Sequence, residues 1–263
     1  MSTRSAVINV MVRAADRAAR SLTRDFGEIE NLQVSRKGPS DFVSAADLRA
    51  EEVLRRELSK ARPGFGFLME ESGAHQGDPD SDKRWIVDTL DGTTNYLHGL
   101  PHFAVSIALE ERGEITAGVV YDPIKEEVFW AEKGMGAFLG NRRMRVSGRK
   151  DLGDSLLATG IPFRGHGDPE LFGRELAAAM RKTAGVRRWG TASLDLAYIA
   201  AGRFDGFWER GLSPWDIAAG VLLVREAGGF VTAIDGRAFA LEGGDLLAAN
   251  SELHPDLVNL LKT

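Results

Sequence analysis

Apolar side chains recur at helical spacing at the start of the chain. Between about residues 3 and 24 they fall on one face, which predicts a helix that covers the core; these residues are Val7, Met11, Ala14, Ala15, Ala18 and Leu22. A second helix is expected after Ser44, with Leu48, Val53, Leu54 and Leu58 on its apolar face. Short apolar runs at 65–69 and 85–87 are typical of buried strands. The polar segment 74–84 between them is predicted to be a surface loop.

The middle of the chain has the pattern of an antiparallel sheet. Apolar runs at 104–110, 115–121 and 127–131 are separated by turn residues, which indicates a meander. From about residue 150, strand-like and helix-like segments alternate, which favours a second α/β unit. Its helices are expected at 171–182, 192–201, 213–227 and 252–261, and its strands at 156–158, 186–189, 204–209, 230–233 and 246–249.

We therefore predict two subdomains. Residues 1–150 would form an α+β unit with the meander, and residues 151–263 an alternating α/β unit. No Gly/Ser-rich or Pro-rich linker separates them, so we expect them to pack rigidly as one body.

Composition excludes several function classes. Apolar residues make up 43% of the chain and charged residues 27%, which are ordinary values for a globular protein. No apolar run has the length of a membrane span. The net charge of −5 disfavours a general nucleic-acid binder, which is usually basic. The chain has no cysteine, which excludes disulfides and thiolate zinc sites and fits a reducing compartment, so we expect a cytoplasmic protein.

Two acids follow the apolar run at 85–87. Asp88 ends the run, and Asp91 precedes Gly92 and Thr93. Both carboxylates could converge on one hard cation, with the carbonyl of Leu90 as a further oxygen ligand of the kind that Mg²⁺ prefers. The alternative interpretation is an ordinary hairpin turn at Asp91-Gly92.

Two other acidic positions lie in similar contexts. Glu70-Glu71 follows the predicted strand at 65–69. Ser213 and Pro214 are strong helix-start signals, and they place Asp216 in the first helical turn. An acid there is explained by the helix dipole alone, but a helix N-terminus also favours phosphate.

All these groups offer oxygen only. Such a donor set suits Mg²⁺ or Mn²⁺ rather than zinc, and divalent ions would relieve the repulsion between the carboxylates. Two cations about 3.5–4 Å apart would serve hydrolysis of a phosphate ester. Glu70 and Thr93 could then orient and deprotonate a water molecule, while main-chain amides of the Gly92-Thr93-Thr94 turn, which opens a short helix, meet the phosphate.

Three segments together resemble the signatures of the inositol monophosphatase family. They are Glu70-Glu71-Ser72, the run Asp-Thr-Leu-Asp-Gly-Thr-Thr-Asn at 88–95, and the run Trp-Asp-Ile-Ala-Ala-Gly at 215–220. The segment 37–47 resembles the lysine–aspartate segment of the same family. The resemblance implies a layered αβαβα sandwich of the inositol monophosphatase/fructose-1,6-bisphosphatase type, in the α/β (α+β) class. It also implies lithium-sensitive phosphomonoester hydrolysis with two or three Mg²⁺ per site, for which Mn²⁺ could substitute, and a homodimer.

The same resemblance assigns roles to individual residues. The metal ligands would be Glu70, Asp88, Leu90 through its carbonyl, Asp91 and Asp216. Groups that take part in the reaction would be Glu70, Asp91 and Thr93. Substrate would be bound by Gly92, Thr93, Ala192, Glu209 and Asp216. Lys37, Asp41 and Asp47 would support the ligands from outside, although Ser44 and Asp47 also fit a capping box.

The chain departs from the family pattern at three positions. Thr89 stands where the family usually has proline, Met69 where it has glycine, and Ser44 where it has threonine. None of these changes removes a ligand, so they bear on loop geometry and metal affinity more than on chemistry.

The predicted function is Mg²⁺-dependent hydrolysis of inositol monophosphate, or a similar small phosphorylated polyol, by activated water without a covalent intermediate. Histidinol phosphate, fructose 1,6-bisphosphate and nucleotide phosphates are alternative substrates. A cationic substrate would favour Glu209 as a partner, and a bisphosphate would need further cations such as Arg187 or Arg188. An alternative of another class is a regulatory protein- or RNA-binding role that keeps the phosphatase fold.

Overall fold

The computed structural model describes residues 4–26, 34–38, 41–163 and 165–262, and the side chains of residues 34–44 lie outside this description. Lys37 and Asp41, which the resemblance placed near the site, are therefore outside the described side chains. None of the described helices has the length and apolar character needed to cross a membrane.

An eight-stranded sheet forms the first half of the described chain. The strands run in the order β10-β9-β8-β7-β6-β5-β3-β4, with β3 parallel to β5 and all other neighbours antiparallel. Their bounds are β3 Gly66–Met69, β4 Gly73–His75, β5 Lys83–Asp91, β6 Ala104–Glu111, β7 Glu114–Asp122, β8 Glu127–Glu132, β9 Gly136–Leu139 and β10 Arg142–Arg143. A separate antiparallel pair precedes it, β1 Val34–Gly38 and β2 Asp41–Ser44.

A five-stranded mixed sheet forms the second half. Its order is β12-β11-β13-β15-β14, with the first three strands parallel and the last two antiparallel to their neighbours. Their bounds are β11 Leu156–Thr159, β12 Gly185–Arg187, β13 Gly206–Glu209, β14 Phe230–Thr232 and β15 Leu246–Ala249.

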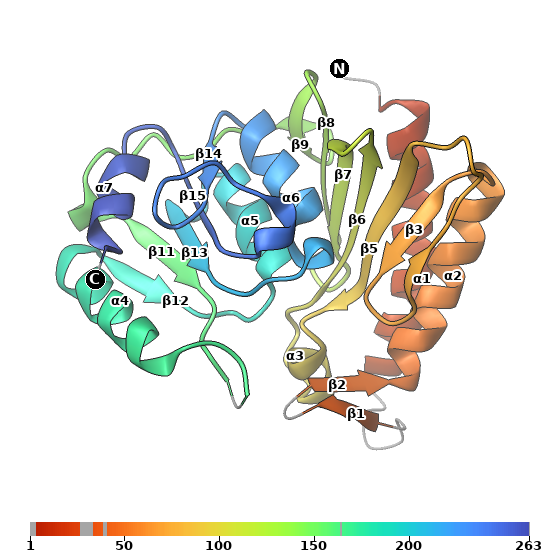
Figure 1. Ribbon diagram of the computed structural model, residues 1–263, viewed down its shortest axis with the longest axis horizontal. Coiled ribbons are helices and arrows are strands. Elements are labelled where there is room, and N and C mark those ends of the chain that lie inside the picture. Colours follow the sequence, from red (N-terminus) through yellow and green to blue (C-terminus); the bar gives the residue numbers. More distant parts are fainter. Residues whose placement is uncertain (1–3, 27–33, 39–40, 164, 263) are drawn as a thin grey trace.

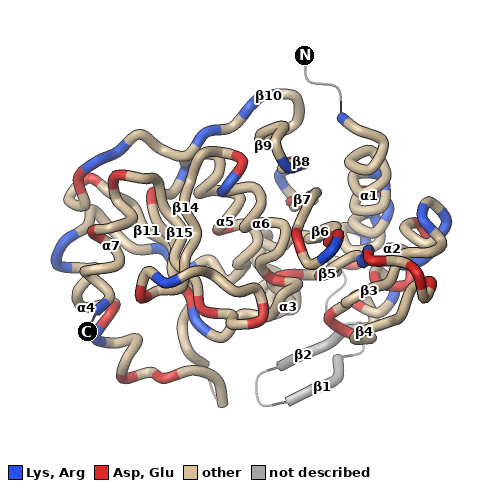
Figure 2. Tube along the Cα trace, turned by 45° about the horizontal axis from the view of Figure 1, so that its top comes forward, with Lys and Arg blue, Asp and Glu red and all other residues tan. Residues whose placement is uncertain are grey.

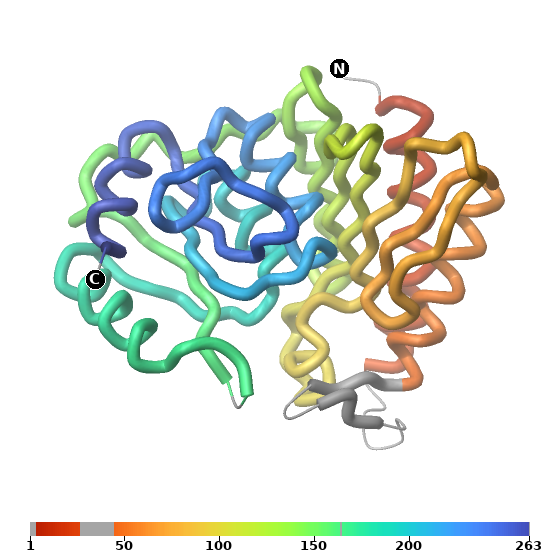
Figure 3. The backbone as a smooth tube through the Cα atoms, in the orientation of Figure 1, coloured from red at the N-terminus to blue at the C-terminus, as the bar shows by residue number. Residues whose placement is uncertain are grey.

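Helices fill the three layers outside and between the sheets (Figure 1). One pair, α1 and α2, covers the outer face of the large sheet, the pair α5 and α6 lies between the sheets, and α4 and α7 cover the far face of the small sheet. The backbone trace in Figure 3 shows the same αβαβα order. The helix bounds are α1 Ala6–Phe26, α2 Ala45–Ala61, α3 Thr93–Leu97, α4 Pro169–Lys182, α5 Ala192–Ala200, α6 Pro214–Glu226 and α7 His254–Leu260.

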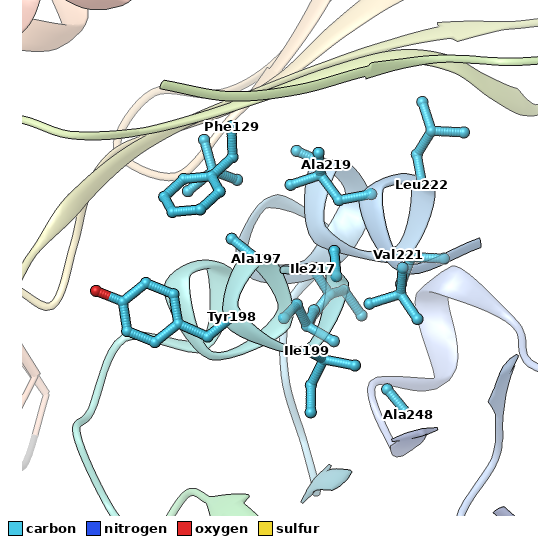
Figure 4. Packing of buried hydrophobic residues seen from close by; sticks show 14 of the residues in the cluster. Phe129, Ala197, Tyr198, Ile199, Ile217, Ala219, Val221, Leu222 and Ala248 are labelled. Carbon is cyan, nitrogen blue, oxygen red and sulfur yellow. The ribbon is translucent and has the colours of Figure 1, made fainter. Parts of the chain in front are cut away.

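The central layer is buried because its two helices lie between the two sheets. Every residue of α5 is buried, as are the eight residues of α6 from Ile217 to Val224. Figure 4 shows Tyr198 of α5 near Phe129 of the large sheet, and Val221 of α6 on the side of Ala248 in the small sheet. This packing fixes the N-termini of both helices relative to the strand ends, which is what positions the site.

Most predicted elements are confirmed, and the differences have physical causes. The surface loop predicted at 74–84 is confirmed for residues 76–82, but its two ends are strand, because 74–75 belong to β4, which pairs with β3, and 83–84 begin β5. The strand predicted at 85–87 is longer and runs from Lys83 to Asp91. Its polar start is tolerated because Lys83 and Arg84 pair across the strands with Glu111 and Glu110. The division into subdomains stays a prediction.

Candidate active site

The strand β5 presents two acids in one small region. Asp88 is 2% exposed and Asp91 9% exposed. In a regular strand, residues three apart point to opposite faces. Here Asp88 pairs with Ser106 and Asp91 with Ala104, so β5 has one residue more than β6 between these pairs. This bulge allows both carboxylates to lie on the same side of the sheet.

The two other acidic positions reach the same region from different elements. Glu70 follows β3, and its main-chain N–H donates to the carbonyl of Val87, so Glu70 lies beside Asp88 on the neighbouring strand. Asp216 lies in the first turn of α6, where its Oδ2 accepts a hydrogen bond of 2.7 Å from the main-chain N–H of Ser213. The predicted helix start at Ser213-Pro214 is confirmed.

Burial and mutual repulsion dominate the electrostatics of these acids. Burial, followed by the charges of Glu70, Asp91 and Asp216, raises the pKa of Asp88 well above its usual value. Burial and the charge of Asp91 raise the pKa of Asp216 in the same direction. Burial also raises the pKa of Asp91 to about 6, although a hydrogen bond from Ser193 opposes that shift.

The donor set fits a hard divalent cation. None of Asp88, Asp91 and Asp216 forms an ion pair with lysine or arginine in the described part of the chain. No three of the described acidic, histidine or cysteine side chains are arranged as a ready-made metal site. The fit therefore rests on chemistry, since buried carboxylates that repel one another are stabilised by a cation with oxygen ligands.

Thr93 connects these acids to α2. Its Oγ1 lies 3.0 Å from the carbonyl oxygen of Leu90 and 3.3 Å from Oδ1 of Asp47, and the hydroxyl proton can be donated to either acceptor. Asp47 is completely buried. Capping of α2 by Asp47 does not by itself explain the contact with Thr93. This contact places Asp47 beside the acids of the candidate site.

A glycine turn fastens the end of β5 to α5. Gly92 precedes α3 with φ of 95°, and a Cβ atom at this position would lie 2.6 Å from Oγ1 of Thr191. The main-chain N–H of Ser193 donates to Oδ2 of Asp91 at 2.7 Å. Ala192, the first residue of α5, is buried beside them. The N-terminus of α5 therefore lies directly against these acids. We call Glu70, Asp88, Asp91 and Asp216 the acidic cluster.

Asn95 of α3 also connects the end of β5 to the segment before α5. Its Nδ2 donates to the carbonyl oxygens of Trp189 at 2.7 Å and His102 at 2.9 Å. Asn95 lies in a sequence motif, but no role was predicted for Asn95 or for Ser193. The motif was the available signal for Asn95, whereas nothing in the sequence marks Ser193.

A cavity of about 550 Å³ opens beside the acids. Its lining includes Glu70 and Asp216 together with Thr159, Gly160, Trp208 and Glu209. Burial, followed by the charge of Asp91, raises the pKa of Glu209 to about 8.

The carboxylate of Glu209 lies close against the backbone of β11. A Cβ atom at Gly160 would be 1.8 Å from Glu209 Oε1, so only glycine leaves room for this carboxylate. The hydroxyl of Thr159 donates to the carbonyl of Trp208 at 2.8 Å and joins the ends of β11 and β13. The sequence alone gives no signal for this role of Gly160.

A further acid lies behind the cavity wall. Asp195 of α5 is 1% exposed, and its Oδ1 has no hydrogen-bond partner among the described residues. Burial and the charges of Glu209 and Asp91 raise its pKa well above the usual value. Sequence analysis missed Asp195, because it follows the pattern of an ordinary helix residue.

Comparisons with known proteins cover nearly the whole chain. Residues 3–263 match the model of the inositol monophosphatase family. An inositol-1-monophosphatase of Mesorhizobium japonicum is 58% identical over 98% of this chain and 97% of its own. A Nus factor SuhB of Pseudomonas aeruginosa is 44% identical over 97% of this chain and 96% of its own.

Solved structures also share this fold. The crystal structure of the extragenic suppressor protein suhB from Bartonella henselae has a TM-score of 0.95 and 56% identity, and the match covers 98% of this chain and 99% of that chain. With the family match, this confirms the predicted fold class.

Proposed function

The chain belongs to the inositol monophosphatase family, and on this premise we propose that it hydrolyses inositol 1-phosphate to inositol and inorganic phosphate. The observation that carries the proposal is the convergence of two buried carboxylates of β5 with the half-buried Glu70 after β3 and Asp216 of α6, beside a cavity lined by Glu209. The similarity to the Mesorhizobium japonicum enzyme supports the choice of substrate.

We propose that two or three Mg²⁺ ions occupy the acidic cluster and that Mn²⁺ can replace them. Glu70, Asp88 and the Leu90 carbonyl would hold one ion, and Asp88, Asp91 and Asp216 another. Bound Mg²⁺ would supply Lewis-acid chemistry that offsets the charge of the carboxylates and the phosphate.

The protein's own groups bind the phosphate and move the proton. The amides of Gly92 and Thr93 donate to phosphate oxygens at the start of α3. The Thr93 hydroxyl, held near Leu90 and Asp47, orients the attacking water, and an oxygen of Glu70 accepts its proton. The water oxygen bonds to phosphorus as the ester P–O bond breaks, the leaving polyol oxygen takes up a proton from solvent, Glu70 returns its proton to solvent, and no enzyme ester forms.

The polyol part of the substrate lies in the cavity beside the acidic cluster. We propose that Glu209, Asp216 and the N-terminus of α5 at Ala192 receive its hydroxyl groups. Glu209 is partly buried, lines the cavity and lies against Gly160, so its carboxylate can contact a ligand that fills the cavity. An acid in this position favours hydroxyl donors or a cationic group over a second phosphate.

The alternative substrates would use the same phosphate-binding and metal-binding groups. They differ in the part of the molecule that lies in the cavity near Glu209. For a bisphosphate, Arg188 is the relevant cation, because its charge lowers the pKa of Glu209 and it forms no ion pair with the described residues. Its guanidinium lies against Gly190, however, and Arg188 does not line the cavity. This arrangement favours a monophosphate. We further propose a cytoplasmic homodimer, as the family resemblance implies.

A binding role is the second candidate, because a relative that is 44% identical is named a Nus factor. Figure 2 shows basic and acidic positions interspersed along the described chain. The complete set of acidic positions favours a phosphatase, with any binding role additional to it.

Phosphate release tests the proposal. The substrates are inositol 1-phosphate, histidinol phosphate, fructose 1,6-bisphosphate and 2′-AMP, each with Mg²⁺ and with chelator. The proteins are the wild type, Asp91→Asn, and the control Asp235→Asn at an exposed surface acid. Turnover led by inositol 1-phosphate, lost with chelator and in Asp91→Asn only, is expected. Another leading substrate would change the assignment, and no turnover by folded, Mg²⁺-loaded protein would favour the binding role.

A further inference from the structure

The end of β13 is held by a buried acid that the proposed reaction does not use. Glu175 of α4 is 1% exposed, and its Oε2 accepts a hydrogen bond of 3.3 Å from Nε1 of Trp208. Its Oε1 pairs with the guanidinium of Arg210. Trp208 and Arg210 are the two neighbours of Glu209 in the chain. The Glu175 carboxylate therefore binds the residues on both sides of Glu209, the acid that we propose binds the polyol.

Arg210 has a second acidic partner. Its other guanidinium nitrogen lies 3.1 Å from Oδ2 of Asp245, and Oδ1 of Asp245 accepts from the main-chain N–H of Gly211 at 2.9 Å. Arg210 therefore joins α4 to the segment before β15. Both of its acids neutralise its charge, so it does not offer a free cation for a second phosphate.

Arg210 follows the last residue of β13 and lines the same cavity as Glu209, together with Glu175 and Trp208. Trp208 and Arg210 contact Glu175, whereas Glu209 lies against Gly160. Because both neighbours of Glu209 are held by one carboxylate, the anchoring of Arg210 sets how far Glu209 reaches into the cavity.

We infer that Arg210 is a positioning residue for polyol recognition, which it serves by holding Glu209 through Glu175 and Asp245. This inference rests on the proposed function. Without Arg210, the buried Glu175 keeps only the long bond from Trp208, and an unpaired buried charge is costly. The end of β13 then relaxes, and Glu209 no longer meets the polyol hydroxyls at bonding distance.

The test compares two substrates that share a phosphate but not a polyol. Arg210→Met is expected to raise KM for inositol 1-phosphate about tenfold with kcat within about twofold, since small misplacements of a binding group are costly. For p-nitrophenyl phosphate, which has no ring hydroxyls, kcat/KM should stay within about twofold. Arg237→Met is the control, because Arg237 pairs only with the exposed Asp235 in the described chain.

Two further variants separate positioning from folding. Arg210→Met with Glu175→Gln removes the uncompensated charge, so its melting temperature should recover while KM for inositol 1-phosphate stays high. Arg210→Lys keeps a cation beside Glu175 and should restore KM in part. If the double variant regains both stability and KM, or if both substrates lose kcat/KM equally, Arg210 is merely structural.

The wild type separates this inference from the proposed function. If it turns over another polyol phosphate best, the proposed substrate is wrong and KM for that phosphate becomes the measured quantity. If it shows no preference for any polyol phosphate over p-nitrophenyl phosphate, both the proposed function and the role of Arg210 are overturned.

Discussion

The main-chain N–H of Ser193 donates a hydrogen bond of 2.7 Å to Oδ2 of Asp91. This bond connects the first turn of α5, in the central layer, to the last residue of β5, in the large sheet. Because both groups are buried, the bond is protected from water and places a helix N-terminus beside a carboxylate. It therefore stabilises the charged form of Asp91 in a region where burial and the other acids oppose that charge.

The first prediction concerns the pH dependence of stability without metal. Burial raises the pKa of Asp91 from 3.8 to about 6. Between these values the folded protein binds a proton that the unfolded chain does not, so stability falls as the pH rises through this window. Half-buried His102, whose pKa is lowered to about 4, changes stability in the opposite sense over the same range, so the effect of Asp91 is measured as a difference between two proteins. In chelator, lowering the pH from 7.5 to 4.5 should change the free energy of unfolding of the wild type, relative to that of Asp91→Asn, by about 2 kcal/mol in the stabilising direction, measured by urea denaturation.

Asp91→Asn is the control for this measurement. It removes the titrating group and part of the repulsion on Asp88 and Asp216, so the stabilisation that Asp91 gains from protonation at pH 4.5 should be lost. Mg²⁺ should stabilise the wild type most at pH 7.5, where protons do not compete for the carboxylates. An equally steep pH dependence in Asp91→Asn would contradict the assignment to Asp91.

The second prediction concerns the hydroxyl of Thr93. Thr93→Val keeps the shape of the side chain but removes the donor that faces Leu90 and Asp47. If this hydroxyl orients water, kcat for inositol 1-phosphate should fall about 10²–10⁴-fold. The midpoint for activation by Mg²⁺ should change little, since the ligands remain. The exposed neighbour Thr94, changed to valine, provides a matched control, and equal losses in both variants would argue against a specific role.

Sequence analysis found the acidic positions because each has a local signal. Glu70 and Asp88 follow apolar runs, and Asp216 follows a helix-start pair, so their neighbours alone indicate an unusual site. The long helices and the meander were predictable for the same reason, since periodicity over ten residues or more reports which face is buried.

Contacts between distant segments were not predictable in this way. The bond from Asn95 to the carbonyl of Trp189 joins residues 94 positions apart, and that from Trp208 to Glu175 joins residues 33 positions apart. The close approach of Gly160 to Glu209 also depends on the pairing of β11 with β13. Such contacts follow from the packing of the two sheets, which no single segment encodes.

The third prediction concerns the space that Gly160 leaves for Glu209. Gly160→Ala would place a Cβ atom 1.8 Å from Glu209 Oε1 in the present geometry, so the carboxylate must move. We expect KM for inositol 1-phosphate to rise at least about tenfold, with kcat/KM for p-nitrophenyl phosphate nearly unchanged. Glu209→Gln, which keeps the shape and removes the charge, should show the same selectivity. A loss of activity toward both substrates would instead indicate that the acidic cluster itself is disturbed.

The fourth prediction concerns stability at Thr89, where the family usually has proline. Thr89 is completely buried between Asp88 and Leu90, and its hydroxyl has no hydrogen-bond partner among the described residues. A buried polar group without a partner costs about 1–3 kcal/mol, so Thr89→Val, which has the same shape, should raise the free energy of unfolding by about 1 kcal/mol. For a chain of this length, that corresponds to a melting temperature about 2–4 °C higher.

Thr159 provides the matched control for this stability measurement. It is also a buried strand threonine, but its hydroxyl donates to the carbonyl of Trp208 at 2.8 Å. Thr159→Val should therefore lower the free energy of unfolding by about 1 kcal/mol, because it removes a bond that is already made. Opposite signs for the two valine variants, measured in chelator so that metal binding does not contribute, would locate the difference in the hydrogen bond. Destabilisation by Thr89→Val would show that the Thr89 hydroxyl has a partner in solution.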